Sequence, residues 1–167
     1  MSGWLCAPQA LWLSLEIAAM VLPLFLVAGI GLGYALAHPI PLRGALDALV
    51  SLPLVFPPIA IGFFLLLLFG RHGPVGEWLY QVGRIDVVFS RPGLVIAAFI
   101  AGLPLVVKPI QSAIEGQARR LIEASYTLGR GPWYTLFHVT IPVARRSIAA
   151  GLMLGLGRSF GEVGISL

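Results

Sequence analysis

The sequence contains little charge. Only 11% of its 167 residues are Asp, Glu, Lys or Arg, whereas about a quarter of an average soluble domain is charged. Disordered chains, coiled coils and nucleic-acid-binding domains need more charge than this, so the composition excludes them. The apolar share is 58% and the mean hydropathy is +0.93. These values indicate a protein that crosses a membrane several times.

Cysteine, lysine and catalytic motifs are also scarce. Cys6 is the only cysteine, which excludes an internal disulfide and a multi-thiolate metal site. Lys108 is the only lysine, and its neighbours Val107 and Pro109 do not form the G-x-x-x-x-G-K-[ST] loop that binds nucleotide phosphates. Neither H-E-x-x-H nor G-x-S-x-G occurs, and the three histidines lie in different connecting segments. We therefore predict no enzymatic activity, no metal site and no cofactor.

Long apolar runs are abundant instead. We predict one domain, 1–167, with four membrane spans at residues 11–37, 46–70, 93–114 and 147–167. No basic residue precedes the first run, so we interpret it as a retained span rather than a cleaved signal peptide. Arginines are concentrated between residues 115 and 146, and the positive-inside rule places this segment in the cytoplasm. The sequence stops within the last apolar run, which predicts that it is truncated at its C-terminus.

The segment 115–146 has the pattern of two short helices. The apolar positions of its first half are spaced along one helical stripe: Ala118, Leu121, Ile122 and Ser125. Gly129 suits the end of that helix because glycine accepts a positive φ, and Pro132 suits the first turn of a second helix. Such a protrusion either lies on the lipid surface as an interfacial helix or docks a cytosolic partner. The residue pattern alone does not decide between these two interpretations.

This segment also resembles a known motif. Glu123, Ala124 and Ser125 are followed after three residues by Gly129, and nine residues later by Val139, with Ile141 and Pro142 completing the pattern. The spacing is similar to the EAA loop of bacterial ABC importer permeases, which reads E-A-A, three residues, G, nine residues, I-x-L-P. Three positions differ mildly from it. The resemblance implies that these seven residues couple the chain to a separate ATPase subunit.

Two further stretches resemble permeases for oxyanions. Residues 51–58 read SLPLVFPP and are similar to the L-P-L-V-x-P-P stretch of molybdate permeases. Residues 158–164 read RSFGEVG and are similar to a stretch shared by molybdate, tungstate and sulfate permeases. The resemblance extends from Leu11 onward. It implies an all-α polytopic membrane protein with the helical bundle of a type I ABC importer permease and with cytoplasmic coupling helices.

The resemblance also implies a function and partners. The chain would be the permease subunit of an ATP-driven molybdate importer in a bacterial inner (plasma) membrane, surrounded by lipid. It would form a homodimer, bind cytosolic ABC ATPase subunits and receive its anion from an extracytoplasmic solute-binding protein. The alternatives are a sulfate/thiosulfate or tungstate permease of the same family, or a membrane scaffold that transports nothing.

Five residues are candidates for a translocation path. Pro53, Pro57 and Pro58 interrupt the second apolar run, and a distorted helix there either lines a path or is a packing kink. Arg158 and Glu162 are four residues apart and share a helix face. They either neutralise each other structurally or set the electrostatics of an anion path.

Glycines recur at a spacing of four residues. The pairs are Gly29/Gly33, Gly151/Gly155 and Gly157/Gly161. This spacing lets helix backbones approach closely in a membrane, although the chain is rich in glycine, with 20 in all.

Overall fold

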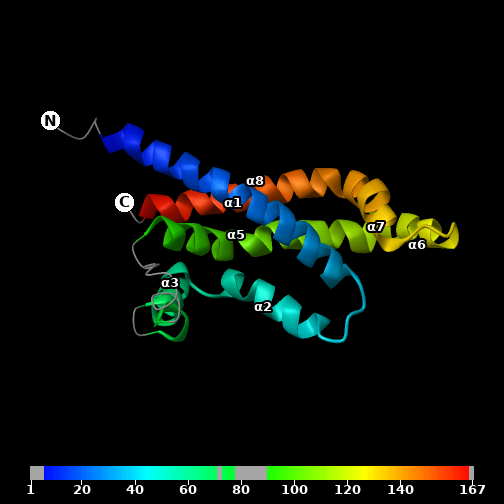
Figure 1. The fold of residues 1–167 in the computed structure, drawn as a ribbon, viewed down its shortest axis with the longest axis horizontal. Coiled ribbons are helices and arrows are strands. Elements are labelled where there is room, and N and C mark those ends of the chain that lie inside the picture. Colours follow the sequence, from blue (N-terminus) through cyan, green and yellow to red (C-terminus); the bar gives the residue numbers. More distant parts are fainter. Residues whose placement is uncertain (1–5, 71–72, 78–89, 166–167) are drawn as a thin grey trace.

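The computed structural model describes residues 6–70, 73–77 and 90–165, and it folds this part of the chain into helices joined by short turns (Figure 1). Three helical stretches are long and apolar enough to cross a membrane: Trp12–Ala37, Arg91–Gly116 and Pro132–Gly161. The helices α1 (Cys6–Ala37), α5 (Arg91–Ala113) and α8 (Ile141–Ile165) supply most of them. The predicted all-α polytopic fold class is thereby confirmed.

The core lies where α1, α5 and α8 meet. The largest helix interface joins α5 to α8, and the next joins α1 to α5. Phe25 of α1 and Val106 of α5 are fully buried there, and Ile148 of α8 packs against the same cluster. The outward faces of the helices carry exposed leucines and methionines. In a bilayer, close packing rather than removal from water holds such helices together.

Glycines bring these helices into contact. A Cβ atom at Gly151 of α8 would lie 3.0 Å from the carbonyl oxygen of Val106 and 3.2 Å from its Cα atom. A Cβ at Gly33 of α1 would lie 2.7 Å from Ile110 Cγ2. By contrast, a Cβ at Gly157 or Gly161 would meet nothing within 4 Å. Two of the three glycine pairs therefore lie at helix contacts, and the third does not.

We expect Gly151→Leu to lower the thermal unfolding midpoint of the protein in detergent, whereas Gly157→Leu leaves it close to the original value. Both positions lie on α8, so the intrinsic helix preference changes equally. Only at Gly151 does the new side chain meet backbone, and such overpacking typically costs about 1–3 kcal/mol. Equal midpoints for the two variants would show that α5 and α8 do not pack closely through Gly151.

The predicted second span, 46–70, consists of two helices. They are α2 (Arg43–Val55) and α3 (Pro58–Phe69), and their axes differ by 118°. Pro57 has the extended conformation φ −58°, ψ 146° and caps α3, whose first residue is Pro58. Proline restricts the residue before it to extended conformations, so two consecutive prolines end one helix and begin another. The pair can cross a membrane only as a broken span.

The helices at the third and fourth predicted spans extend beyond the predicted boundaries. Helix α5 continues through the π-helical segment Ile114–Ala118 into α6 (Arg119–Thr127). Helix α7 (Pro132–Thr135) likewise continues through a second π-helical segment, Leu136–Thr140, into α8. The helices are longer than the apolar runs because a helix tolerates charged residues once it leaves the membrane.

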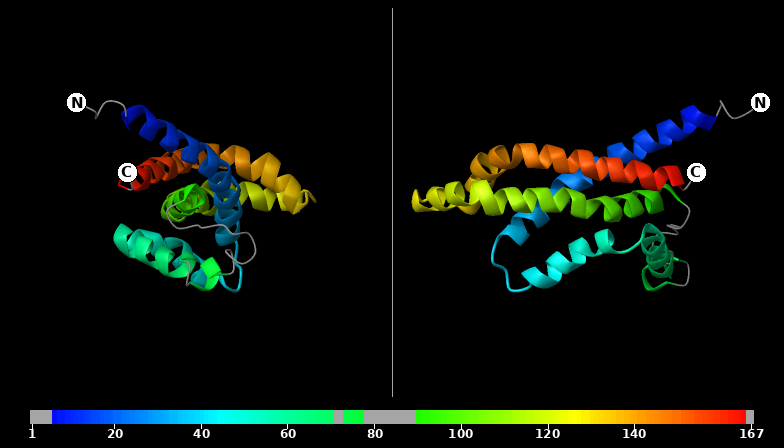
Figure 2. Two further views of the ribbon diagram at one scale, coloured as in Figure 1. Left: turned by 60° about the vertical axis from the view of Figure 1, so that its left-hand side comes forward. Right: turned by 180° about the vertical axis from the view of Figure 1, so that it is seen from behind.

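Residues 119–140, from the start of α6 to the end of the second π-helical segment, project beyond one end of the bundle (Figures 1 and 2). We call this projection the knob. Helix α1 begins and helix α8 ends at the opposite end of the bundle (Figure 1). On the side of α5 away from α8, α2 and α3 lie against the bundle (Figure 2).

Candidate functional site

The turn of the knob is a Schellman motif. Gly129 has φ +75° and is the only glycine with a positive φ among the described residues. The N–H of Gly129 donates to the carbonyl of Tyr126 at 3.0 Å, and the N–H of Arg130 donates to the carbonyl of Ser125 at 3.1 Å. A Cβ at Gly129 would meet nothing within 4 Å, so the backbone conformation alone requires glycine. The glycine turn and the start of α7 at Pro132 agree with the prediction.

A buried hydrogen bond joins the two helices of the knob. The hydroxyls of Ser125 and Thr135 lie 2.8 Å apart, and that of Thr135 also donates to the carbonyl of Gly131 at 3.1 Å. Since Thr135 has one hydroxyl proton, Ser125 is the donor between them. Ala118 and Ile122 are buried on the same face, as the stripe predicted. Leu121 differs from the prediction, because 49% of it is exposed.

The remaining motif residues divide between the surface and the base of the knob. Glu123 and Ala124 are exposed on α6, and the Glu123 carboxylate accepts a hydrogen bond from Arg119 Nε at 3.1 Å. Val139 and Ile141 are partly buried against the core, whereas Pro142 is exposed at the start of α8. The structure thus brings the seven predicted residues into one region, of which only part is accessible.

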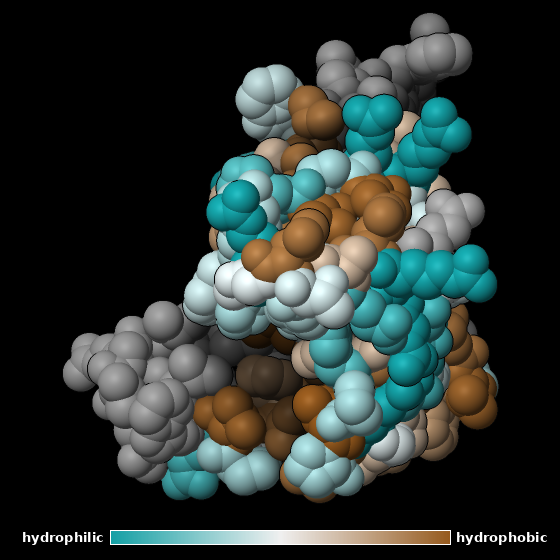
Figure 3. Space-filling model, turned by 90° about the vertical axis from the view of Figure 1, so that its right-hand side faces the viewer, coloured by the Kyte–Doolittle hydropathy of each residue, from teal (hydrophilic) through white to brown (hydrophobic). Residues whose placement is uncertain are grey.

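The outer surface of the knob is apolar at its centre and charged around it. Figure 3 looks onto this end of the molecule and shows apolar side chains surrounded by hydrophilic ones. The large exposed apolar side chains of the knob are Leu121, Leu128, Trp133 and Phe137. Its exposed arginines are Arg119, Arg120 and Arg130. An exposed apolar patch with a polar rim is typical of a protein or membrane interaction site.

Aromatic stacking gives α7 an ordered outer face. The ring of Tyr134 lies parallel to that of His138, with centroids 4.2 Å apart, and the guanidinium of Arg130 lies 4.6 Å from the Tyr134 centroid. Cation–π contacts of this kind contribute about 0.5–1 kcal/mol at exposed sites. This contact holds the Arg130 guanidinium against Tyr134 on the outer surface of the knob.

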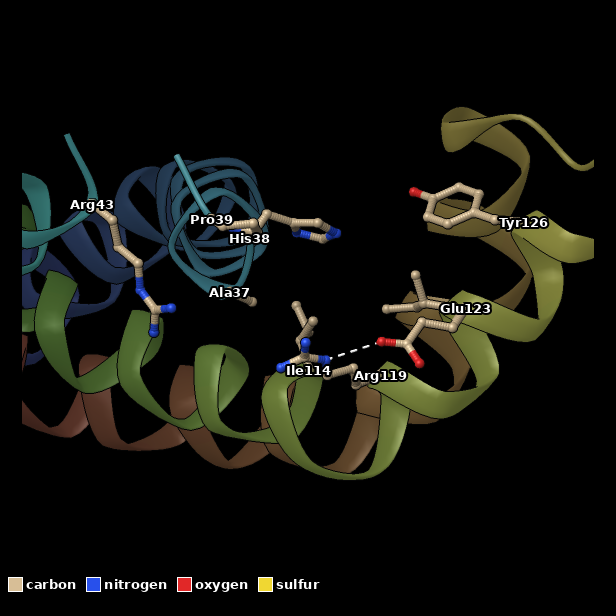
Figure 4. Close-up of a pocket in the computed structure, with 9 residues that line it drawn as sticks. Ala37, His38, Pro39, Arg43, Ile114, Arg119, Glu123 and Tyr126 are labelled. Carbon is tan, nitrogen blue, oxygen red and sulfur yellow. Dashed lines mark hydrogen bonds and ion pairs between the residues drawn. The ribbon is translucent and has the colours of Figure 1, made fainter. Parts of the chain in front are cut away.

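A cavity of about 220 Å³ separates the knob from the end of α1 (Figure 4). The imidazole of His38 and the ring of Tyr126 point toward each other across it, and Arg119 and Glu123 form an ion pair at its rim. The other lining residues are Ala37, Pro39, Arg43, Ile114 and Ile122. The charges of Arg119 and Glu123 balance, and Arg43 is paired with Glu115, so the lining suits ordered water better than an anion.

Two polar contacts hold the base of the knob to the bundle. The hydroxyls of Tyr34 on α1 and Tyr126 on α6 lie 3.0 Å apart. Arg43 at the start of α2 forms an ion pair with Glu115 in the first π-helical segment. A displacement of the knob would therefore pull on α1 and α2 through these contacts, as well as on α5 and α8, which continue into the knob.

The contact between Lys108 and Asp47 was not predicted from the sequence. Lys108 Nζ on α5 lies 2.7 Å from Asp47 Oδ1 on α2. The sequence analysis identified Lys108 as the only lysine and assigned no partner to it or to Asp47. The sequence did contain a pattern that could have indicated this contact. Lys108, Gln111 and Glu115 share one face of a helix, and Arg43 and Asp47 share a face of another, with charges that complement the first.

The candidate path residues fall into two groups. Pro53 lies within α2, and Pro57 and Pro58 form the bend between α2 and α3. Arg158 and Glu162 lie one turn apart on α8. Helix α5 stands between these groups, so a single chain does not bring them together (Figure 1). Among the described residues, no three His, Cys, Asp or Glu side chains cluster as a metal site would require.

Residues 25–166 match the family described as binding-protein-dependent transport system inner membrane component. The chain is 40% identical over 159 residues to the molybdenum transport system permease protein ModB of Azotobacter vinelandii, which covers 95% of this chain and 70% of that protein. It is 38% identical over 160 residues to ModB of Escherichia coli K12, with the same coverage of both chains.

A sulfate permease also matches. The chain is 32% identical over 157 residues to the sulfate transport system permease protein CysW of Escherichia coli K12, which covers 93% of this chain and 54% of that protein. These matches confirm the resemblance to ABC importer permeases that the motifs of the sequence predicted. The chain belongs to the family of binding-protein-dependent transport system inner membrane components.

Proposed function

We propose that this chain is the permease subunit of an ATP-driven molybdate importer of the inner membrane. The knob carries the proposal: an ordered pair of short helices presents an apolar patch at the arginine-rich end of the bundle. The chain has no phosphate-binding loop, so ATP hydrolysis takes place on a partner. The apolar patch fits a cytosolic ATPase subunit, with Glu123, Ala124 and Gly129 at the contact and Ser125, Val139, Ile141 and Pro142 supporting it.

The assembly that follows is a homodimer of permeases in lipid with two ATPase subunits. The described residues of one chain form three candidate spans and one candidate broken span, and the path would run between two such bundles. A solute-binding protein delivers the anion at the end of the bundle opposite the knob. Closure of the ATPase subunits moves both knobs and turns the path outward, as in other rigid-body transitions.

The path is assigned to two regions of each chain. Pro53 within α2 and the bend formed by Pro57 and Pro58 would supply a broken helix at membrane depth, where transporters often bind their substrates. Arg158 and Glu162 supply charge on α8. Two chains in a dimer offer a way for these regions, which α5 separates within one chain, to contribute to one route.

Molybdate is preferred over sulfate because the relatives named as molybdenum permeases are more similar to this chain than those named as sulfate permeases. Both anions are tetrahedral dianions and differ mainly in size. A sulfate/thiosulfate or tungstate permease is therefore the second candidate. A scaffold that docks a partner and transports nothing is the third.

Reconstitution tests the three candidates. Proteoliposomes containing the permease and its ATPase, with the solute-binding protein added, are expected to accumulate radiolabelled molybdate when ATP is supplied. Excess unlabelled molybdate should suppress the signal more strongly than excess sulfate. Stronger suppression by sulfate or tungstate would identify the second candidate. ATPase binding without uptake of any of these anions would identify the scaffold.

The orientation is a separate prediction. Described arginines gather at the knob end, where Arg43, Arg119 and Arg130 lie, and this asymmetry supports a cytoplasmic knob. With residues 115–146 in the cytoplasm, the four-span topology places the segment between the second and third spans outside the cell. Most of that segment lies outside the described residues, but Glu77 is described and exposed. With Cys6 replaced, a cysteine at Glu77 should react with an impermeant thiol reagent in intact cells, whereas one at Arg119 should not. The opposite labelling pattern would invert the topology.

A further inference from the structure

The interface between α2 and α5 is apolar on one side and charged on the other. Val50 of α2 packs on Val107 of α5 and Leu36 of α1 in a small buried cluster. Beside this cluster, Lys108 donates to Asp47 at 2.7 Å. One turn further along α5, the side-chain amide of Gln111 donates to Glu115 at 3.1 Å, and Glu115 pairs with Arg43.

The Lys108–Asp47 pair lies within a membrane span. Lys108 lies 17 residues after the first residue of the candidate span Arg91–Gly116, about 25 Å along a helix that rises 1.5 Å per residue. The other end of the span is about 12 Å away. A hydrocarbon core of about 30 Å centred on this candidate span would contain the pair, in the half nearer the knob.

The described residues leave part of the Lys108–Asp47 pair exposed. The exposed fractions are 34% for the Lys108 side chain and 38% for that of Asp47. Charges at this depth face a bundle interior or water, because contact with lipid tails costs several kcal/mol. A water-filled route on the exposed side of the pair would meet this requirement. A solute in that route would meet the ammonium directly.

The chemistry of the pair suits weak, reversible anion binding. An ammonium group has three N–H donors, and Asp47 accepts one of them at the distance observed. The other two are available to an oxyanion approaching from the exposed side. Asp47 balances the charge of Lys108, so a dianion gains less there than it would beside an isolated cation.

We propose that Lys108 is the transient binding group for the transported oxyanion and that Asp47 is a resident carboxylate that competes with it. This inference rests on the proposed function. The incoming anion takes the place of Asp47 on the ammonium, and Asp47 returns when the anion leaves. The carboxylate prevents the path from retaining its substrate.

The test separates this role from a purely structural ion pair by measuring retention and transport together. Retention is the amount of radiolabelled molybdate held by the purified permease–ATPase complex without the solute-binding protein. Transport is the maximal ATP-driven uptake into proteoliposomes with that protein present. Thermal unfolding midpoints show that each variant is folded.

Asp47→Asn should raise retention and lower maximal uptake, each by about tenfold, the factor expected from hydrogen bonds to charged groups. Lys108→Met should lower both by a similar factor, and Lys108→Arg should keep most of the retention. Glu115→Gln is the matched control, because it breaks the neighbouring ion pair at the same helix interface. It should leave retention unchanged.

A structural ion pair would give a different pattern. Asp47→Asn would then lower retention and uptake together or change neither, and either result overturns the proposal. Unchanged retention in Lys108→Met overturns it as well. If Lys108→Met does not assemble with the ATPase, Asp47→Asn and Lys108→Arg decide the question. Failure of the unmodified complex to take up molybdate would instead overturn the proposed function.

Discussion

Gly129→Val is expected to abolish most ATP-driven uptake while leaving the membrane spans intact. Gly129 has φ +75°, a region that β-branched residues avoid. Holding valine there would cost about 1–3 kcal/mol, so the chain should instead rearrange the turn. Rearrangement breaks the hydrogen bonds to Tyr126 and Ser125 that close the turn, and it separates α6 from α7. The apolar patch is then no longer presented as one surface to the ATPase subunit.

The chain offers a close control in Gly131→Val. Gly131 lies two residues away and has φ −71° and ψ 165°, which valine adopts readily. Neither position has an atom within 4 Å of an added Cβ, so the two substitutions differ only in backbone strain. Gly129→Asn should be intermediate, because asparagine tolerates the left-handed region.

Tagged ATPase that co-purifies with the permease, measured beside uptake into vesicles, checks the prediction. Gly129→Val should lose both signals, and Gly131→Val should keep both. If Gly129→Val retains the ATPase in the original ratio and still transports, the turn does not position a docking surface. The knob would then be better described as an interfacial helix.

The parts of the fold that depend on local chemistry were predictable from the sequence. The Gly129 turn and the start of α7 at Pro132 follow from backbone preferences that a few neighbouring residues determine. The apolar runs predicted four spans, because a bilayer demands continuous apolar sequence, and at three of them the described residues form long apolar helices. The EAA-like spacing predicted the family, which the comparison confirmed.

Features that depend on the placement of distant segments were not predictable. Prolines indicated a distorted second span, but the 118° between α2 and α3 depends on what each helix packs against. The prediction that Leu121 is buried was wrong. Leu121 lies at the edge of the apolar stripe, and which edge positions are buried depends on the helix that packs against α6. The Lys108–Asp47 contact requires the register of α2 against α5, which joins residues 61 positions apart.

The two π-helical segments were also not predicted from the sequence. Ile114–Ala118 and Leu136–Thr140 both lie where a span passes into the knob. Each adds a residue to a helical turn, and no residue pattern in the sequence signals this. The buried hydroxyl of Thr140, at the end of the second segment, has no hydrogen-bond partner among the described residues. Both segments depend on how the knob joins the bundle, which local preference does not determine.

Trp133→Ala is expected to weaken binding of the ATPase subunit about 30-fold or more, the effect of removing a hot-spot side chain worth at least about 2 kcal/mol. Trp133 is 73% exposed on the knob, beside Leu128 at 78%. Its removal leaves no cavity in the core, so the thermal unfolding midpoint of the permease alone should change little. Loss of binding without loss of stability is the signature of a docking residue.

Trp12→Ala is the matched control for this loss of binding. Trp12 lies in the first third of α1, a helix that begins at the end of the bundle opposite the knob, and at 72% its exposure is almost the same. Both substitutions remove the same amphipathic ring, which would anchor equally well at a membrane interface. If the knob docks the ATPase, only Trp133→Ala should reduce the affinity measured by titrating the ATPase into the reconstituted permease. If the knob lies on lipid instead, neither variant should alter that affinity, because the ATPase would then bind elsewhere on the chain.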